Sequence, residues 1–139
     1  MMIYIAASQP LDFVAWNDAQ PAFYVSELHE LEISVRDKFS SAYVYHAGSH
    51  EGCGCGFQYG KYPEFEDDER YLKRASLDAF SAYLAQQLER VDSIELYACW
   101  DGDQTATSEY QRTLTPNSLR SEEFFFLERE FSRIGKDAA

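Results

Sequence analysis

The stretch DERYLKRASLDAFSAYLAQQLERV, residues 68–91, decides the fold. Its apolar side chains recur every three or four residues without an interrupting proline or glycine, which predicts one long amphipathic helix. At about 1.5 Å per residue this helix is roughly 34 Å long, enough to cross a sheet. The apolar face that it would bury consists of Leu72, Leu77, Phe80, Leu84, Leu88 and Val91.

An acidic run, EFEDDE at residues 64–69, precedes this helix. Negative charge is favourable at the positive end of a helix, and Asp67 or Asp68 is a suitable N-cap. A cation site is the alternative interpretation. We expect the run to serve the start of the helix.

A strand pattern follows the helix at residues 94–100, where side chains alternate between two faces. The side chains that should meet the helix are Ile94, Leu96, Ala98 and Trp100. Before the helix, residues 53–58 alternate side chain with no side chain, which predicts another strand. A strand-helix-strand unit normally makes its two strands parallel.

Shorter apolar and β-branched runs between turn residues predict the rest of the sheet. These runs lie at residues 2–7, 22–27, 109–115 and 124–131. Asp101-Gly-Asp103 is expected to make a hairpin turn, with residues 109–115 as the returning strand. Together the elements predict a single α+β domain over residues 1–139, with a mixed sheet of about five to seven strands packed on one long helix.

Three connecting segments carry weaker patterns. Residues 8–20 are expected to form a loop in which Trp16 fills the core. Residues 28–41 suit either a strand or a helix, and we expect a loop with a short strand or turn that leaves His29 exposed. Thr115-Pro-Asn-Ser118 is expected to start a short helical turn.

The composition excludes several classes of partner. The 139 residues carry 24 acids against 12 bases, a net charge of −12, without a basic cluster. Such a surface repels phosphate backbones and anionic membranes, so we expect neither nucleic acid nor a membrane as a partner. Apolar residues make up 45% of the chain, which predicts a globular domain with a real core.

Three cysteines in a chain of ordinary size do not indicate a disulfide framework. The N-terminus lacks the basic region of a signal peptide, and no apolar run approaches the length of a membrane span. We therefore expect a protein of the reducing cytoplasm.

The chemically distinctive side chains gather in residues 46–57, HAGSHEGCGCGF, with two of the three histidines and two of the three cysteines. We interpret this segment as a hairpin, with strands at residues 42–47 and 53–58. In its second strand, Gly54 and Gly56 leave one face without side chains, so either another element or a ligand packs against that face. The candidate binding residues are His46, His50, Cys53, Gly54, Cys55 and Gly56.

Several kinds of chemistry compete for this hairpin. Zinc is bound by imidazole and thiolate, although the one-residue cysteine spacing is shorter than in common zinc knuckles. The corresponding ligand set is His46, His50, Cys53 and Cys55. The cysteines could instead act as a redox pair or a histidine-activated nucleophile, the successive amides could bind an anion, or the whole segment could be packing. We favour no cofactor, and because the usual catalytic motifs are absent we leave enzymatic activity undecided.

Cys99 should not join the other two sulfurs. If residues 54–58 and 94–100 are close parallel strands, Cys55 starts one strand and Cys99 ends the other. The gap is then roughly 13 Å, at about 3.3 Å per residue over four residues. We therefore expect any metal to be held by the hairpin alone.

Two segments, GSHEGCGCGF at residues 48–57 and ELYACWDGD at residues 95–103, resemble signature stretches of a small family of bacterial proteins without an established activity. The resemblance extends over most of the chain, including FFFLE at residues 124–128. It implies a shared fold and a bacterial cytosolic setting, and it assigns no functional residue.

The leading hypothesis is a non-enzymatic module that binds a small molecule or a protein through the hairpin at residues 46–57. Nearby tyrosines suit a recognition surface, because tyrosine is apolar with a polar tip. These are Tyr43, Tyr45, Tyr59 and Tyr62. The alternative is a zinc- or thiol-dependent protein, and the sequence does not define an oligomeric state.

Overall fold

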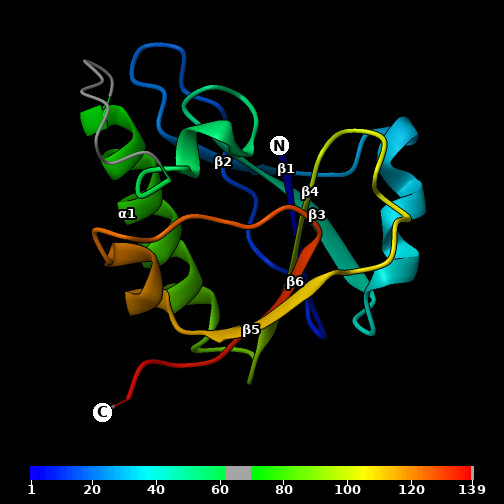
Figure 1. The fold of residues 1–139 in the computed structure, drawn as a ribbon. Coiled ribbons are helices and arrows are strands. Elements are labelled where there is room, and N and C mark those ends of the chain that lie inside the picture. Colours follow the sequence, from blue (N-terminus) through cyan, green and yellow to red (C-terminus); the bar gives the residue numbers. More distant parts are fainter. Residues whose placement is uncertain (62–69, 139) are drawn as a thin grey trace.

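A mixed sheet of six strands lies between two helical layers in the computed structural model, which describes residues 1–61 and 70–138 (Figure 1). The strands are β1 (Met2–Ala7), β2 (Phe23–Ser26), β3 (Tyr43–Ser49), β4 (Ile94–Cys99), β5 (Tyr110–Leu114) and β6 (Glu130–Ile134). They lie in the order β2-β3-β1-β4-β6-β5, and every neighbouring pair is antiparallel except β5 and β6. The predicted α+β class with one mixed sheet is confirmed.

One face of the sheet packs against the long helix α1 (Arg70–Gln87). Leu77, Phe80 and Leu84 are fully buried there, as the periodicity predicts. The short 3₁₀ helix η3 (Pro116–Arg120) lies beside α1, where a helical turn was expected. The predicted start of the helix at residue 68, its caps Asp67 and Asp68 and the acidic run lie outside the described residues.

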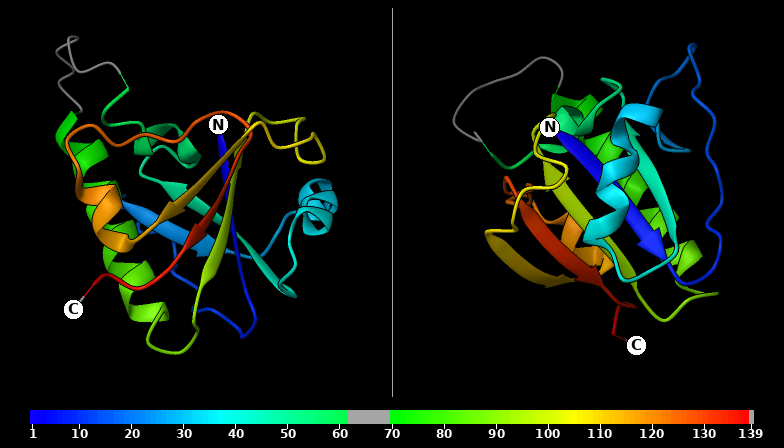
Figure 2. Two further views of the ribbon diagram at one scale, coloured as in Figure 1. Left: turned by 60° about the horizontal axis from the view of Figure 1, so that its bottom comes forward. Right: turned by 90° about the vertical axis from the view of Figure 1, so that its right-hand side faces the viewer.

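The opposite face is covered by a 3₁₀ helix, η1 (Glu30–Lys38), so both faces of the sheet are buried (Figure 2). The prediction of a loop with a short strand or turn here was wrong. His29 caps this helix with its Nδ1, which accepts a hydrogen bond from Leu31 N at 3.2 Å, while Glu32 Oε1 accepts from His29 N at 3.0 Å. This reciprocal capping favours a helical start, and it leaves His29 exposed as expected.

The predicted second strand of the hairpin is wrong, because residues 54–57 form a 3₁₀ turn, η2 (Gly54–Phe57). Cys53 caps this turn, and Gly54 N donates to Met1 O at 2.7 Å. The chain therefore folds over the start of β1 instead of returning along β3. The parallel pair that flanks α1 is β3 and β4, with the antiparallel β1 between them.

Cys99 is fully buried on the η1 face, whereas Cys55 packs against the α1 side of the sheet. The expected separation of Cys99 from Cys55 is present, but its cause differs from the prediction. The two side chains lie on opposite faces of the sheet, because residues 54–57 are not a strand.

The C-terminal third differs from the prediction in two ways. β5 does not return along β4, because β6 lies between them and pairs with both. The apolar run at residues 124–131 is largely irregular, and only its last two residues enter β6. Phe124 and Phe126 are instead buried in the α1-side core, where Gln58 holds the Phe126 backbone.

Trp16 does not fill the core as expected. Its side chain is 42% exposed and lies edge-on to Tyr24, with 5.5 Å between ring centroids. Within the described residues, no helix is both long and apolar enough to cross a membrane.

Candidate functional site

The two histidines of residues 46–57 lie on different sides of the sheet. His46 is buried in β3 on the η1 face, with its ring against Tyr4 and Tyr24. His50 follows the end of β3, and its Nδ1 lies 2.8 Å from Ser76 Oγ of α1. The four side chains of the alternative zinc set, His46, His50, Cys53 and Cys55, therefore do not converge.

The two glycines of η2 are covered by the protein itself. A Cβ on Gly54 would lie 2.5 Å from Ile3 Cγ1, and one on Gly56 would lie 2.2 Å from Ser49 Oγ. Of the two explanations for the bared face, close packing of another element is the one that the structure shows. A ligand could reach Gly54 or Gly56 only by displacing these side chains.

The four tyrosines do not form one recognition surface. Tyr45 is buried, Tyr43 is 43% exposed, and Tyr59 lies under the guanidinium of Arg70, 4.1 Å from the ring centroid. Tyr62 lies outside the described residues.

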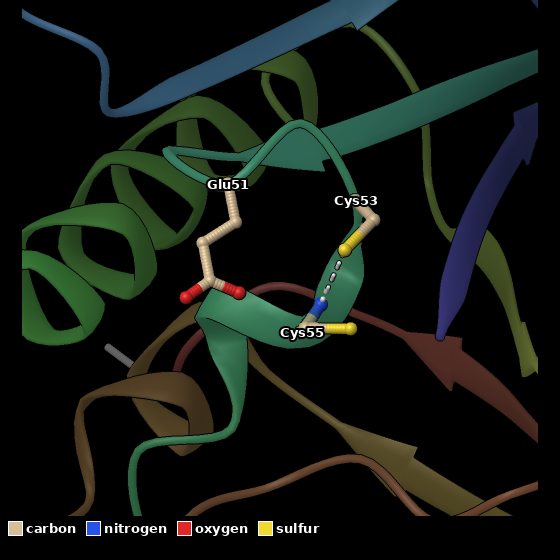
Figure 3. A group of neighbouring side chains, drawn as sticks. All are labelled: Glu51, Cys53 and Cys55. Atoms are coloured by element: carbon tan, nitrogen blue, oxygen red, sulfur yellow. Dashed lines mark hydrogen bonds between the residues drawn. The ribbon is translucent and has the colours of Figure 1, made fainter.

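Glu51, Cys53 and Cys55 form a compact group at the turn that follows β3 (Figure 3). Their oxygen and sulfur atoms lie within 4.8 Å of one another, and all three cysteines of the chain are free thiols. Cys55 N donates to Cys53 Sγ at 3.4 Å, because the 3₁₀ turn folds the two cysteines toward each other. The two cysteines are therefore close together, as they would also be in an extended strand. The third side chain of the group is Glu51, whereas the sequence predicted His46 and His50.

Burial alone raises the pKa of both thiols in this group. For Cys55, the hydrogen bonds from the Cys53 thiol and from the Met1 amino group, 3.1 Å away, outweigh burial and lower the pKa. For Cys53, donating that hydrogen bond adds to the effect of burial and raises the pKa. Cys55 is therefore the sulfur that ionises first.

A second place, on the η1 face, is an open pocket of about 960 Å³. Two loops enclose it, one at residues 13–16 and the other at residues 27–29, and β2 and β3 form its base. Side chains that line it include Phe13, Trp16, Tyr24, Glu27, Glu32 and His46. Its volume and its largely apolar wall are those of a small-molecule site.

A chain of polar groups forms the floor of this pocket. Tyr4 OH donates to Glu32 Oε2 at 2.6 Å, and His46 Nδ1 lies 3.3 Å from the same oxygen. On the other side of the ring, His46 Nε2 lies 2.9 Å from Tyr24 OH, which itself donates to Gly52 O. The floor therefore joins β1, β2, β3 and η1 through adjacent hydrogen-bonding groups.

Hydrogen-bond accounting defines the charge of this floor. Tyr24 has one hydroxyl proton and gives it to Gly52 O, so His46 Nε2 must donate to the Tyr24 oxygen. Burial raises the pKa of Glu32, but the contact with His46 and the hydrogen bond from Tyr4 outweigh it and lower the pKa to about 2. Nε2 of His46 thus donates to Tyr24, while Nδ1 is buried 3.3 Å from Glu32 Oε2 without making a hydrogen bond.

Comparison with known proteins adds no functional assignment. No family model, curated protein or solved structure matches the chain. The resemblance to a bacterial family remains an expectation, and the functional argument rests on the geometry of the two places described above.

Sequence reasoning missed the pocket, although part of its signal was present. In β2, Phe23 and Val25 are buried whereas Tyr24 is half-buried, and in β3 the neighbours of His46 face the α1 side. Strand alternation thus places Tyr24 and His46 together on the other face. The contribution of Glu32 was hidden because η1 was not predicted as a helix.

Proposed function

We propose that the protein is a non-enzymatic binding module and that its small-molecule ligand occupies the pocket on the η1 face. This proposal keeps the leading hypothesis but moves the site from the glycines to His46 and its neighbours. The observation that carries it is the combination of exposed aromatic walls with a polar floor in which Glu32, Tyr24 and His46 Nε2 are already hydrogen-bonded within the protein. Sites for small molecules commonly have this composition.

The walls and charges favour a ligand with a flat apolar body and a cationic or neutral head. Phe13 and Trp16 are 59% and 42% exposed and line the same pocket, and it is such grouping of exposed apolar side chains that indicates an interaction site. Glu27 lies at the rim, and the chain carries a net charge of −12. An anionic ligand is disfavoured by this field, whereas a cation over an aromatic face is stabilised.

Binding suits the floor better than catalysis. Glu32 accepts from Tyr4 and from His29 N and faces His46, so both of its oxygens already have partners within the protein. Tyr24 occupies the remaining nitrogen of His46. A general base needs a lone pair directed at its substrate, and this floor offers rigidity and recognition instead.

A tryptophan reporter tests the proposal, because the chain has two tryptophans and only Trp16 lines the pocket. In a Trp100→Phe variant, a series of arylalkylamines such as phenethylamine should change Trp16 fluorescence saturably. The carboxylate counterparts, such as phenylpropanoate, should bind at least about tenfold more weakly, which corresponds to about 1.4 kcal/mol. In the matched Trp16→Phe variant, Trp100 should not respond. Failure of the amine, neutral and carboxylate series alike to change Trp16 would overturn the proposal.

The cellular compartment is part of the same proposal. Free thiols and the absence of a disulfide framework support a reducing compartment, and we propose the cytoplasm. The bacterial setting rests on the resemblance of the two sequence stretches alone.

A further inference from the structure

We propose that Glu51, Cys53 and Cys55 bind a zinc ion, with His50 completing the coordination from the buried side. This site lies beside the pocket, whose lining includes Gly52, but it does not depend on the proposed function. It differs from the set expected from the sequence, because Glu51 replaces His46.

The ligand atoms are already close to tetrahedral spacing. Zinc–sulfur bonds of about 2.3 Å place two sulfurs about 3.8 Å apart in a tetrahedron. The atoms of Glu51, Cys53 and Cys55 lie within 4.8 Å of one another, so shifts of about 1 Å bring these three to tetrahedral spacing. His50 lies outside this group of three, with its Nε2 3.9 Å from Glu51 Oε1, and its side chain must turn toward the sulfurs to complete the site. Two thiolates with a carboxylate are a donor set that suits zinc, and their negative charge matches the cation.

His50 provides the independent observation that points to a ligand. Its side chain is 6% exposed, its Nε2 has no hydrogen-bond partner, and this atom lies 3.9 Å from Glu51 Oε1. Ser76 Oγ donates to Ala22 O, so it must accept from His50 Nδ1, which therefore carries the proton. Nε2 is thus the ring nitrogen that is left for a ligand, buried and without a hydrogen bond beside the Glu51 carboxylate, where a cation could be bound by both groups.

The orientation of this imidazole is the one found around metal-binding histidines. A ligating histidine usually donates its other N–H to a fixed acceptor, which sets its tautomer and direction. Ser76 has this role, and it is fully buried in α1. His50 is thus held by the helix with its free nitrogen beside Glu51.

The backbone of the turn is held in place before any metal arrives. Ser49 Oγ accepts from Gly56 N at 3.1 Å and from Glu51 N at 3.2 Å, and it donates to Cys53 O at 2.5 Å. Gly52 adopts a φ of +84°, which lets the chain reverse between Glu51 and Cys53. A preorganised turn lowers the cost of ordering the ligands on binding.

Solvent reaches the site from the outside. Glu51 is exposed and both cysteines are partly exposed, whereas Cys99 is fully buried. A structural cysteine is usually buried as Cys99 is, so the exposure of Cys53 and Cys55 favours a chemical role over packing.

Metal titration of the reduced, metal-free chain tests the site. One zinc per chain should bind, and cobalt(II) should give thiolate-to-metal charge-transfer absorption with tetrahedral visible bands. Glu51→Gln and His50→Ala should each weaken zinc binding at least about tenfold, the usual range for a lost contact at a metal site. The matched controls Glu89→Gln and Cys99→Ala should bind zinc as the parent does.

Alkylation of the unaltered chain gives a second measurement that does not depend on how the variants fold. Zinc should protect Cys53 and Cys55 from iodoacetamide, as mapped by mass spectrometry, while Cys99 stays unreactive with and without metal. The proposal is overturned if zinc does not bind, if it leaves the reactivity of both cysteines unchanged, or if the charge-transfer band persists in the Cys53→Ser/Cys55→Ser protein. Zinc binding that His50→Ala does not weaken would remove His50 from the ligand set.

Discussion

The carboxylate of Glu32 contacts three partners. Its two oxygens accept from Tyr4 OH and His29 N, and the second partner of Oε2 is the ring of His46. Each of these contacts favours the ionised form, which is why the pKa falls to about 2 despite partial burial. The negative charge of Glu32 is therefore part of the folded arrangement.

Replacing Glu32 by Gln should make the free energy of unfolding less dependent on pH in the acidic range. The pKa of Glu32 is about 2 in the folded chain against an ordinary 4.5, so its contribution is complete above about pH 4.5 and is lost as the pH falls toward 2. After discounting for solvent, the Glu32→Gln chain should be about 1–2 kcal/mol less stable at pH 7. Urea unfolding across this pH range should show the difference shrinking with acid. A difference that stays constant with pH, as expected for Glu89→Gln, would contradict the prediction.

Gly54 is required by the side chain that packs on it. An added methyl group would lie 2.5 Å from Ile3 Cγ1 and 3.0 Å from Met1 O, and Ile3 is fully buried. Gly54→Ala should therefore lower the free energy of unfolding by about 1–3 kcal/mol, the usual cost of overpacking. Gly135→Ala, which meets open space, should be close to neutral. Equal effects of the two substitutions in urea unfolding would contradict this account.

At the scale of elements, the run at residues 124–128 shows how one side chain replaces a strand partner. Gln58 Oε1 accepts from Phe126 N at 2.8 Å, and Gln58 Nε2 donates to Phe126 O at 2.8 Å. This satisfies the backbone as a neighbouring strand would, so Phe124 and Phe126 can enter the core from an irregular segment.

Gln58→Leu should lower the free energy of unfolding, because it removes both hydrogen bonds to the Phe126 backbone. Two backbone groups of Phe126 would lose their partners, at about 1–3 kcal/mol each. We expect a loss of about 2–4 kcal/mol in urea unfolding, with faster amide exchange at Phe126. Gln86→Leu, an exposed glutamine of α1, is the matched control and should change stability little. Unchanged exchange at Phe126 would rule out this role for Gln58.

The elements that the sequence predicts well are those whose periodicity is local. α1, β1 and β4 show the helical or strand repeat in their own residues, and each was found close to its expected range. η2 could not be foreseen, because the alternation at residues 53–58 fits a strand equally well. The contacts that hold the turn, such as those of Gly54 N with Met1 O and Gly56 N with Ser49 Oγ, do not appear in the local pattern. Phe126 depends on Gln58, 68 residues away, and Trp16 contacts Tyr24 of a separate strand, so neither contact is visible in a local pattern.

The candidate sites follow the same rule. The cysteines and His50 were found from their concentration in the sequence, and the turn does bring Cys53 and Cys55 together. The grouping of His46 with them was wrong. Alternation along β3 places His46 on the opposite face of the sheet from Tyr45 and Ala47, and this could have been applied to the sequence. Glu51 was not among the expected ligands.

At the scale of the whole molecule, Gly52 connects the two proposed sites. It lies between Glu51 and Cys53, it lines the pocket, and its carbonyl accepts the hydroxyl of Tyr24. An ion bound through Glu51 and Cys53 would fix the side chains on either side of Gly52, so this part of the pocket wall would have less freedom to lose when the second ligand binds.

Zinc should therefore raise the affinity of the pocket for an arylalkylamine, by about fivefold or more. Titration of Trp16 fluorescence in the Trp100→Phe chain, with and without zinc, measures this factor, and the amine should raise zinc affinity equally. Tyr24→Phe removes the hydrogen bond to Gly52 and should reduce the effect. Identical amine affinities with and without zinc would show that the sites are independent.

The central position of β1 has a consequence for biosynthesis. β1 leaves the ribosome before the other five strands of the sheet, yet it lies between β3 and β4, and β4 ends at Cys99. A nascent chain that has reached only β3 can pair one side of β1, and the other side stays open until about fifty more residues have been translated. During that interval the bare edge can recruit another polypeptide, so the yield of soluble chain should depend on chaperones and on the temperature of expression.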